Sequence, residues 1–303
     1  PDTPETPTHP ETPEPPSPSP ATPAIEVRQL SKTYNGHDFA VRDLSFALDP
    51  GGFLALVGAS GCGKTTTLKM LNRLIEPTHG EVLIHGRPSR ELDPIQLRRG
   101  IGYAFQGVGL FPHLSVYDNV AVVPRLLGWD ADRIRRRFDH LMGMVNLDPD
   151  QFASQRPDRL SGGQRQRVGF CRAIAADPEL LLMDEPFGAL DPVTRLHIRR
   201  DFLELEEMLR KTIILVTHDL EEAFEMADLI CLLDRGRVQQ LGTPHELLFS
   251  PANDFVREFM AEKAFQLELG AVTVGQLFDH LPAQAAGETA PLKLAPATTV
   301  LRA

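Results

Sequence analysis

The sequence predicts an α/β fold in which a mostly parallel sheet is covered by helices. Three observations support this prediction. Short apolar runs alternate with helical patterns over residues 53–233, which is typical of parallel strands connected by helices. Residues 25–48 instead alternate apolar and polar side chains, as antiparallel strands do. Residues 110–160 are almost wholly helical in pattern, so we expect a helical subdomain there.

The individual elements follow from the same patterns. Residues 25–34 and 39–48 read as antiparallel strands that end in a turn at 49–52. Helical periodicity covers residues 65–75, 117–127, 131–146, 164–176 and 192–209. Continuous apolar runs, typical of strands buried on both faces, occupy residues 53–57, 101–105, 180–183, 213–216 and 229–233.

The two ends of the chain differ from the middle. Residues 1–24 are rich in Pro and Thr and carry neither Lys nor Arg, so we expect a disordered or polyproline-like tail. A Pro-rich docking motif is the alternative. The predicted domain covers residues 25–260, and residues 261–303 form a C-terminal extension that resembles a linker or the start of a further domain.

Composition excludes some classes of protein. The 303 residues are 42% hydrophobic, enough to fill a core, and the formal net charge of −10 disfavours a partner that is a nucleic-acid backbone. No stretch approaches the roughly 18–20 apolar residues that a spanning helix needs, and the first residues do not resemble a signal peptide. We therefore expect contact with a membrane only through partners. The three cysteines are widely spaced and are interpreted as isolated thiols in a reducing cytosol.

Residues 58–65, GASGCGKT, match the P-loop pattern GxxxxGK[ST] between a predicted strand and a predicted helix. In this loop, backbone N–H groups turn toward phosphate oxygens, Lys64 adds a positive charge, and the Thr65 hydroxyl can bind magnesium. Cys62 is interpreted as a spacer and not as a nucleophile. The predicted nucleotide-binding residues of this segment are Gly58, Ser60, Gly61, Cys62, Gly63, Lys64, Thr65 and Thr66.

A P-loop alone is shared by kinases, GTPases, helicases and motor ATPases, so a second motif is needed. Residues 160–164 read LSGGQ and continue into RQRVGFCRAIAADPELLLMDEP, which resembles the signature and Walker B segments of ABC ATPases. The resemblance covers about residues 25–260 and implies a RecA-like core, an antiparallel β subdomain and an α-helical subdomain. It also implies ATP and Mg²⁺ as cofactors. Ser161, Gly162, Gly163 and Gln164 would contact the nucleotide from the start of a helix.

Asp184 and Glu185 follow the apolar run 180–183, which places two carboxylates at the end of a buried strand. Behind a P-loop, Asp184 would hold magnesium and Glu185 would polarise the attacking water. The alternative is ordinary surface charge.

Four further residues match family positions. Tyr34 matches the aromatic residue that stacks on adenine, and Gln106 the glutamine that contacts magnesium and the attacking water. Asp191 matches the residue that meets the partner's nucleotide site, and His218 the histidine on the γ-phosphate, which makes the predicted catalytic set Glu185, His218, Gln106 and Lys64. On the residues alone, a strand tyrosine such as Tyr34 is more often ordinary packing, and a lone histidine at a strand end such as His218 is usually structural.

The resemblance implies a head-to-tail homodimer in which each ATP lies between the P-loop of one copy and residues 161–164 of the other. The implied partners are integral membrane permease subunits and an extracytoplasmic substrate-binding protein, and the implied location is the cytoplasmic face of the cell membrane. The mechanism is phosphoryl transfer to water. Other classes remain open: a soluble ABC ATPase of translation or DNA maintenance, and a nucleotide switch without turnover.

Residues 101–129 and 181–195 resemble the ATPases of glycine betaine, carnitine and choline importers. The resemblance implies a quaternary amine osmoprotectant as the solute, with another small solute such as an amino acid as the alternative. Some of those relatives continue into paired CBS regulatory domains, and residues 291–303 could begin one. The apolar residues Leu110, Phe111, Leu114 and Val116 are either a socket for a permease helix or packing of the helical subdomain. Residues 133–137 are interpreted as a solvated basic face of a helix, with lipid head groups or a partner as the alternative contact.

Overall fold

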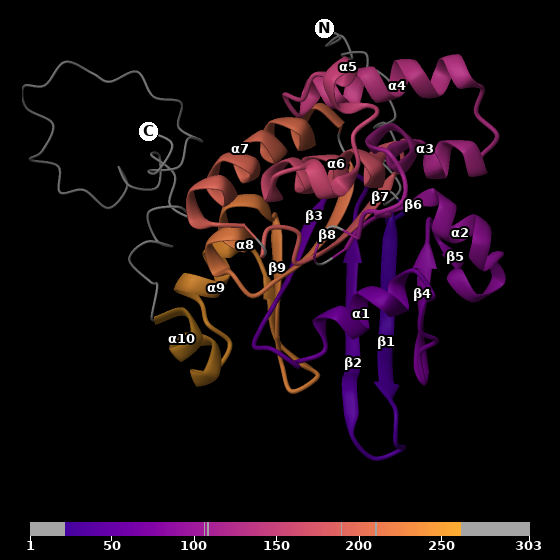
Figure 1. Ribbon diagram of the computed structural model, residues 1–303. Coiled ribbons are helices and arrows are strands. Elements are labelled where there is room, and N and C mark those ends of the chain that lie inside the picture. Colours follow the sequence, from indigo (N-terminus) through magenta and orange to yellow (C-terminus); the bar gives the residue numbers. More distant parts are fainter. Residues whose placement is uncertain (1–21, 106, 108, 189, 210, 262–303) are drawn as a thin grey trace, which may run out of the picture.

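A computed structural model describes residues 22–105, 107, 109–188, 190–209 and 211–261 (Figure 1). The predictions made for residues 1–21, for Gln106 and for residues 262–303 lie outside this part of the chain.

A small antiparallel sheet comes mainly from the N-terminal segment. Its strand order is β2-β1-β4-β5. The strands are β1 (Ile25–Thr33), β2 (Phe39–Leu48), β4 (His79–Ile84) and β5 (Arg87–Pro88). The two antiparallel strands predicted from residues 25–48 are confirmed. Strands β4 and β5 were not predicted, because their short segments do not alternate apolar and polar residues clearly.

The larger sheet contains the buried strands that the apolar runs predicted. Its order is β10-β9-β3-β8-β7-β6, parallel except that β10 runs antiparallel to β9. The strands are β3 (Phe53–Val57), β6 (Ile101–Ala104), β7 (Leu180–Asp184), β8 (Thr212–Thr217), β9 (Leu229–Asp234) and β10 (Arg237–Gly242). In register, Val57 pairs with Thr217 and Asp184 with Val216, so the carboxyl ends of β3, β7 and β8 lie at one edge.

The described helices include the five predicted periodic segments, of which 192–209 keeps its predicted ends and the other four differ at theirs, together with further helices outside those segments. They are α1 (Lys64–Leu71), α2 (Pro94–Gly100), α3 (Val116–Leu126), α4 (Ala131–Met144), α5 (Pro149–Phe152), α6 (Gly162–Ile174), α7 (Pro192–Leu209), α8 (Leu220–Met226), α9 (Pro244–Phe249) and α10 (Asp254–Ala261). Short 3-10 helices occupy Ser89–Glu91 and Pro157–Arg159. Helix α4 ends before its predicted end at 146, because Asn146 adopts a positive φ of 54°. Helix α6 begins at Gly162, two residues early, because Ser161 and Gln164 form a capping box.

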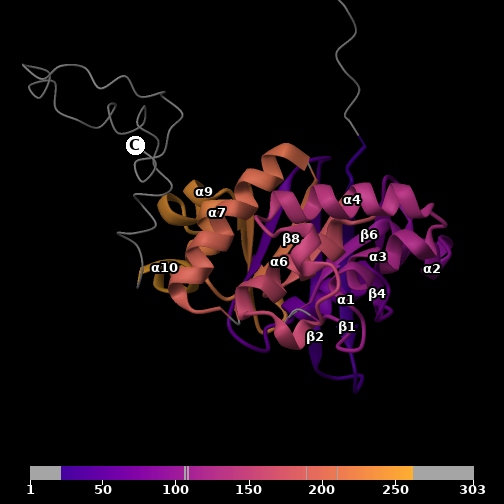
Figure 2. The same ribbon diagram turned by 45° about the horizontal axis from the view of Figure 1, so that its top comes forward.

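Two hydrophobic cores lie on opposite faces of the larger sheet. Alternate strand residues point to opposite faces, so Ala55, Met183 and Leu215 pack toward α3, α4, α6, α7 and α8. Their neighbours Leu56, Leu182 and Val216 pack toward the antiparallel sheet, α1 and α2. Figures 1 and 2 place α2 at one end of the molecule and α9 and α10 at the other. The residues between 110 and 160 are helical, as predicted, in α3, α4, α5 and the second 3-10 helix.

Within the described residues, none of the helices combines the length and the apolar character that crossing a bilayer requires.

Candidate active site

The loop between β3 and α1 needs glycine at two places because the backbone of other strands lies against it. At Gly58, with φ 152°, a Cβ atom would lie 2.1 Å from the Leu233 carbonyl oxygen. At Gly63, with φ 107°, a Cβ atom would lie 2.3 Å from the Ala40 carbonyl oxygen. Any side chain at either position would force β9 or β2 away. The P-loop predicted from the sequence is therefore held between these two strands.

The Lys64 ammonium lies inside this loop. Lys64 is 5% exposed, and its Nζ donates to the carbonyl oxygens of Gly58 at 2.7 Å and Ala59 at 3.0 Å. The Cys62 sulfur is 3.8 Å from Nζ, and burial raises the pKa of this thiol. A buried thiol with a raised pKa is a poor nucleophile, which agrees with the role of Cys62 as a spacer.

Thr65 and Asp184 meet although 119 residues separate them in the chain. The Thr65 hydroxyl donates to Asp184 Oδ1 at 3.0 Å. Asp184 is 5% exposed at the end of β7, and burial raises its pKa, with the Thr65 hydrogen bond acting in the opposite direction. A hydroxyl and a buried carboxylate are hard oxygen ligands of the kind that magnesium accepts when phosphates and waters complete its shell. The pair therefore fits the predicted metal site.

Glu185 and His218 face each other from the ends of the neighbouring strands β7 and β8. Glu185 Oε2 is 3.3 Å from His218 Nδ1. The His218 side chain is 58% exposed and the Glu185 side chain 22% exposed. A carboxylate beside an exposed imidazole at the edge that also holds Thr65 and Asp184 can orient water next to a bound phosphate.

The predicted signature residues form a well-capped and accessible helix start. The Gln164 N–H donates to Ser161 Oγ at 3.2 Å, and the Ser161 N–H donates to Gln164 Oε1 at 2.9 Å. Ser161 and Gly162 are exposed. Among the described residues, no hydrogen bond or ion pair joins residues 161–164 to the P-loop. Within one chain, these residues are thus not part of the site around Lys64.

Three other predicted residues have different surroundings. Tyr34 follows β1 with 66% of its surface exposed, and Lys32 Nζ lies 5.3 Å from its ring centroid, which leaves an aromatic face for stacking. Asp191 accepts from the Thr194 N–H at 3.1 Å, and hydrogen bonding by the Thr194 side chain, followed by this backbone contact, lowers its pKa. It thereby caps the start of α7. Gln106 lies outside the described residues, between Phe105 and Gly107.

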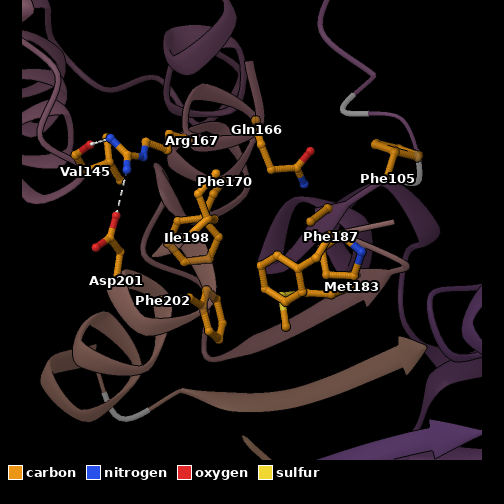
Figure 3. A pocket seen from close by; sticks show the side chains of 13 residues that line it. Phe105, Val145, Gln166, Arg167, Phe170, Met183, Phe187, Ile198, Asp201 and Phe202 are labelled. Atoms are coloured by element: carbon orange, nitrogen blue, oxygen red, sulfur yellow. Dashed lines mark hydrogen bonds and ion pairs between the residues drawn. The ribbon is translucent and has the colours of Figure 1, made fainter. Parts of the chain in front are cut away.

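A small apolar cavity lies behind the end of β7 (Figure 3). The side chains of Phe170 and Phe202 point into it, and Arg167 crosses its edge, where it donates to Val145 O at 3.3 Å and to Asp201 at 2.9 Å. Its volume of about 30 Å³ is too small for a nucleotide. We assign it to packing between α6 and α7 and not to ligand binding.

Sequence reasoning missed the two residues that flank His218. Thr217 and Asp219 are joined by a hydrogen bond from the Asp219 N–H to Thr217 Oγ1 at 3.0 Å, and the Thr217 hydroxyl also contacts buried Glu222 at 2.6 Å. A hydroxyl and a carboxylate on either side of a candidate histidine were the available signal. The burial of Glu222 was not visible in the sequence.

Comparison with known proteins places this geometry in one family. The profile of the family described as ABC transporter matches residues 41–188. The glycine betaine/carnitine/choline transport ATP-binding protein OpuCA of Bacillus subtilis (strain 168) is 45% identical over 259 residues, which cover 85% of this chain and 68% of that protein. The osmoprotectant import ATP-binding protein OsmV of Salmonella typhimurium is 46% identical, covering 84% of this chain and 66% of that protein. The chain thus spans about two thirds of the length of these relatives.

Solved structures agree with the sequence comparison. The dimeric post-hydrolysis structure of the ATP-binding cassette MJ0796 with ADP and Pi aligns with a TM-score of 0.64 at 32% identity, covering 72% of this chain and 98% of that one. The structure of cbiO1 from Clostridium perfringens, part of an ABC transporter complex, aligns with a TM-score of 0.69 at 25% identity, covering 83% of this chain and 100% of that one. With a P-loop, an LSGGQ helix and a carboxylate pair all in their places, the chain belongs to the ABC transporter family, as an ATP-binding cassette.

Proposed function

We propose that this chain is the ATP-hydrolysing subunit of an importer that takes up a quaternary amine osmoprotectant such as glycine betaine, choline or carnitine. The observation that carries the solute class is the 45–46% identity to proteins named for glycine betaine, carnitine and choline transport and for osmoprotectant import. The chemistry of the site supports ATP hydrolysis independently, because Lys64 lies in the P-loop, both carboxylates stand at the end of β7 and His218 stands at the end of the adjacent strand β8.

The phosphates of ATP would lie against the P-loop and the start of α1. There the Lys64 ammonium would exchange its contacts with the Gly58 and Ala59 carbonyls for phosphate oxygens. Thr65 and Asp184 would hold Mg²⁺, which supplies positive charge against the developing negative charge of the phosphates. Tyr34 would stack on the adenine, since its ring is exposed.

Hydrolysis requires a water molecule in line with the γ-phosphate. Glu185 would orient and polarise this water, and His218 would contact the γ-phosphate from the other side of the same strand edge. We assign Gln106 the role of contacting both the metal and the water, on the resemblance to the family alone. The protein contributes position and charge, and no covalent intermediate is needed.

The complete site needs a second copy of the chain. Residues 161–164 open α6, with residues 161 and 162 exposed, but among the described residues they make no hydrogen bond or ion pair with the P-loop of the same chain. In a head-to-tail dimer each copy would close the nucleotide site of the other, with Asp191 near the contact. The dimeric cassette among the structural relatives supports this arrangement.

The permease would dock beside Phe105, the residue that precedes Gln106. A groove of about 480 Å³ is lined by Phe105, Phe111, Val122, Val123 and Arg172. The two phenylalanine rings are 45% and 42% exposed. Val116, which the sequence placed in the same apolar patch, is fully buried and packs the helical subdomain. Such a binding arrangement would place the subunit at the cytoplasmic face of the membrane.

Reconstitution tests the proposed solute. The full chain, its permease and the substrate-binding protein in vesicles should hydrolyse ATP faster when a quaternary amine is present. Sugars and unmethylated amino acids are the matched controls and should not stimulate hydrolysis. Stimulation by unmethylated amino acids alone would refute the quaternary amine and favour an amino-acid importer.

A further inference from the structure

Glu222 is a buried carboxylate that the mechanism above does not use. It lies on α8, four residues after His218, and is 3% exposed. Acidic side chains are almost never buried to this degree unless they have partners. Its partner is the Thr217 hydroxyl, which donates to Glu222 Oε2 at 2.6 Å. Burial raises the pKa of Glu222, and the Thr217 hydrogen bond, followed by the charges of Arg199 and Arg195 on α7, acts against that rise.

The Thr217 hydroxyl links the two residues that flank His218. Thr217 Oγ1 belongs to the residue before the histidine and accepts the N–H of Asp219, the residue after it, at 3.0 Å. Asp219 in turn accepts from the Glu221 N–H at 2.9 Å and so caps α8. The His218 side chain is 58% exposed, so little packing fixes its direction. The turn that carries it is fixed instead by the hydrogen bonds of Thr217 and Asp219.

A second contact joins this turn to the start of α7. Arg195 Nη1 lies 3.5 Å from Asp219 Oδ2, and Arg195 Nη2 donates to the Leu190 carbonyl oxygen at 3.1 Å. The Arg195 N–H also donates to the Asp191 carbonyl oxygen at 2.9 Å. The segment 190–191, whose Asp191 we place near the dimer contact, is therefore linked through one arginine to the residue that follows His218.

We propose that Glu222, acting through the Thr217 hydroxyl, is a positioning residue that sets the direction of His218 toward the γ-phosphate. This inference rests on the proposed role of His218 in hydrolysis. Arg195 contributes to this positioning, because it links the turn that carries His218 to residues 190–191. Glu222, Thr217 and Arg195 affect the turnover of bound ATP and not nucleotide affinity, because none of them belongs to the P-loop or to the Thr65–Asp184 pair.

The test compares Thr217→Val, which keeps the shape and loses the hydroxyl, with Thr217→Ser, which keeps the hydroxyl. In the full chain, Thr217→Val should lower kcat by on the order of ten- to a hundredfold, as expected for a misplaced group, and leave the KM for Mg-ATP within about twofold. Thr217→Ser should retain most of the wild-type kcat. Thermal unfolding of both variants checks that the fold is kept.

A double-mutant cycle separates positioning from general structural support. In the His218→Ala background, Thr217→Val should cause no further loss of kcat, because the histidine that it positions is gone. An undiminished loss in that background, or a wild-type kcat in Thr217→Val alone, would overturn the inference. If Thr217→Val does not fold, Glu222→Met serves in the same cycle, with Glu222→Gln, which keeps an acceptor oxygen, as the variant expected to retain kcat.

The single variant His218→Ala reports on the proposed function by itself. A strong loss of kcat in His218→Ala, together with no loss in Thr217→Val, would remove only the positioning role of Glu222 and Thr217. A wild-type kcat in His218→Ala would remove the proposed role of His218, and the positioning inference with it.

Discussion

Glu185 occupies an uncommon backbone conformation at the end of β7. Its φ is 45°, in the left-handed region that most side chains avoid. Its N–H donates to the Val216 carbonyl oxygen at 2.9 Å, and its carbonyl oxygen accepts from the Gly188 N–H at 3.2 Å. Those two hydrogen bonds hold the strained residue so that its carboxylate turns toward His218. Strain of this kind is typical of residues placed for catalysis.

For Glu185→Gln we expect intact ATP binding and the loss of most hydrolysis. The amide keeps the shape of the side chain but loses the charge that orients water. The variant should accumulate as an ATP-bound dimer, which size-exclusion chromatography with and without Mg-ATP would detect. Wild-type turnover in this variant would contradict the assignment of Glu185.

Replacement of Asp184 by Asn should stabilise the nucleotide-free protein while removing Mg-dependent hydrolysis. Burial raises the pKa of Asp184, so folding disfavours its charged form. The contribution of Asp184 to folding stability is fully present at acid pH, below the pKa of this residue in the unfolded chain. It is lost as the pH rises through the raised pKa of Asp184 in the folded chain. At neutral pH the variant should therefore be more stable than the wild type, seen as a higher Tm.

The matched control for this prediction is Asp49→Asn at an exposed position. It should leave the Tm nearly unchanged. The advantage of Asp184→Asn should shrink as the pH is lowered, because the wild-type carboxylate is then protonated. A Tm for Asp184→Asn below that of the wild type at neutral pH would show that the carboxylate stabilises the empty site.

At the scale of elements, the start of α6 is capped, but among the described residues it makes no hydrogen bond or ion pair with the P-loop of its own chain. Its capping box satisfies the N–H groups of Ser161 and Gln164, and residues 161 and 162 are exposed. The P-loop, by contrast, is packed between β9 and β2, and the Lys64 ammonium donates a hydrogen bond to the Gly58 carbonyl oxygen within it. In the proposed head-to-tail dimer, one element would supply the pocket and the other would cover the nucleotide site of the second copy.

Ser161→Arg should abolish hydrolysis and leave nucleotide binding by the monomer nearly unchanged. The bulky cation blocks closure over the ATP of the partner, while loss of the cap costs only about 1 kcal/mol of helix stability. Mixed dimers of Ser161→Arg and Lys64→Ala chains should keep at most one intact composite site, measured as residual ATPase activity of the mixture. Should both defects prove to lie in the same site, the head-to-tail arrangement would be wrong.

At the scale of the molecule, one sheet separates two cores and brings the chemical groups to a single edge. The helical subdomain packs on one face of the sheet. Phe105, the residue that precedes Gln106, lines the groove proposed for the permease. Arg172 donates to the Gly109 carbonyl oxygen at 2.6 Å and lies over the rings of Phe105 and Phe111 at 5.8 and 5.7 Å. These contacts hold in place the two exposed rings of the surface that we propose for the permease.

Phe111→Ser should weaken the association with the permease and leave the ATPase activity of the isolated subunit within about twofold, because the ring makes its contacts outside the nucleotide site. Co-purification with the permease measures the association. Leu126→Ser is the control, since Leu126 is 53% exposed and does not line the groove. Equal loss for both variants would place the docking surface elsewhere.

Much of the site was predictable because its motifs are local. Residues 58–65, 160–164 and 184–185 are contiguous, and each follows or precedes a strand or helix that the periodicity predicts. Tyr34 and His218 were assigned only through resemblance, because a single aromatic or histidine carries no local pattern. Thr217 and Glu222 were missed for the same reason: the sequence LEEAFEM does not indicate which of its glutamates is buried.

The sequence by itself determined the buried strands, five of the described helices and the chemical groups at their ends, because side-chain periodicity and loop motifs are properties of neighbouring residues. Only the tertiary structure decided that β3 lies between β9 and β8, and that β8 lies beside β7. This strand order brings Thr65 to Asp184 across 119 residues and Glu185 to His218. Apolar strands of similar composition can pair in many orders, and the crossover helices and the packing on both faces of the sheet select one of them.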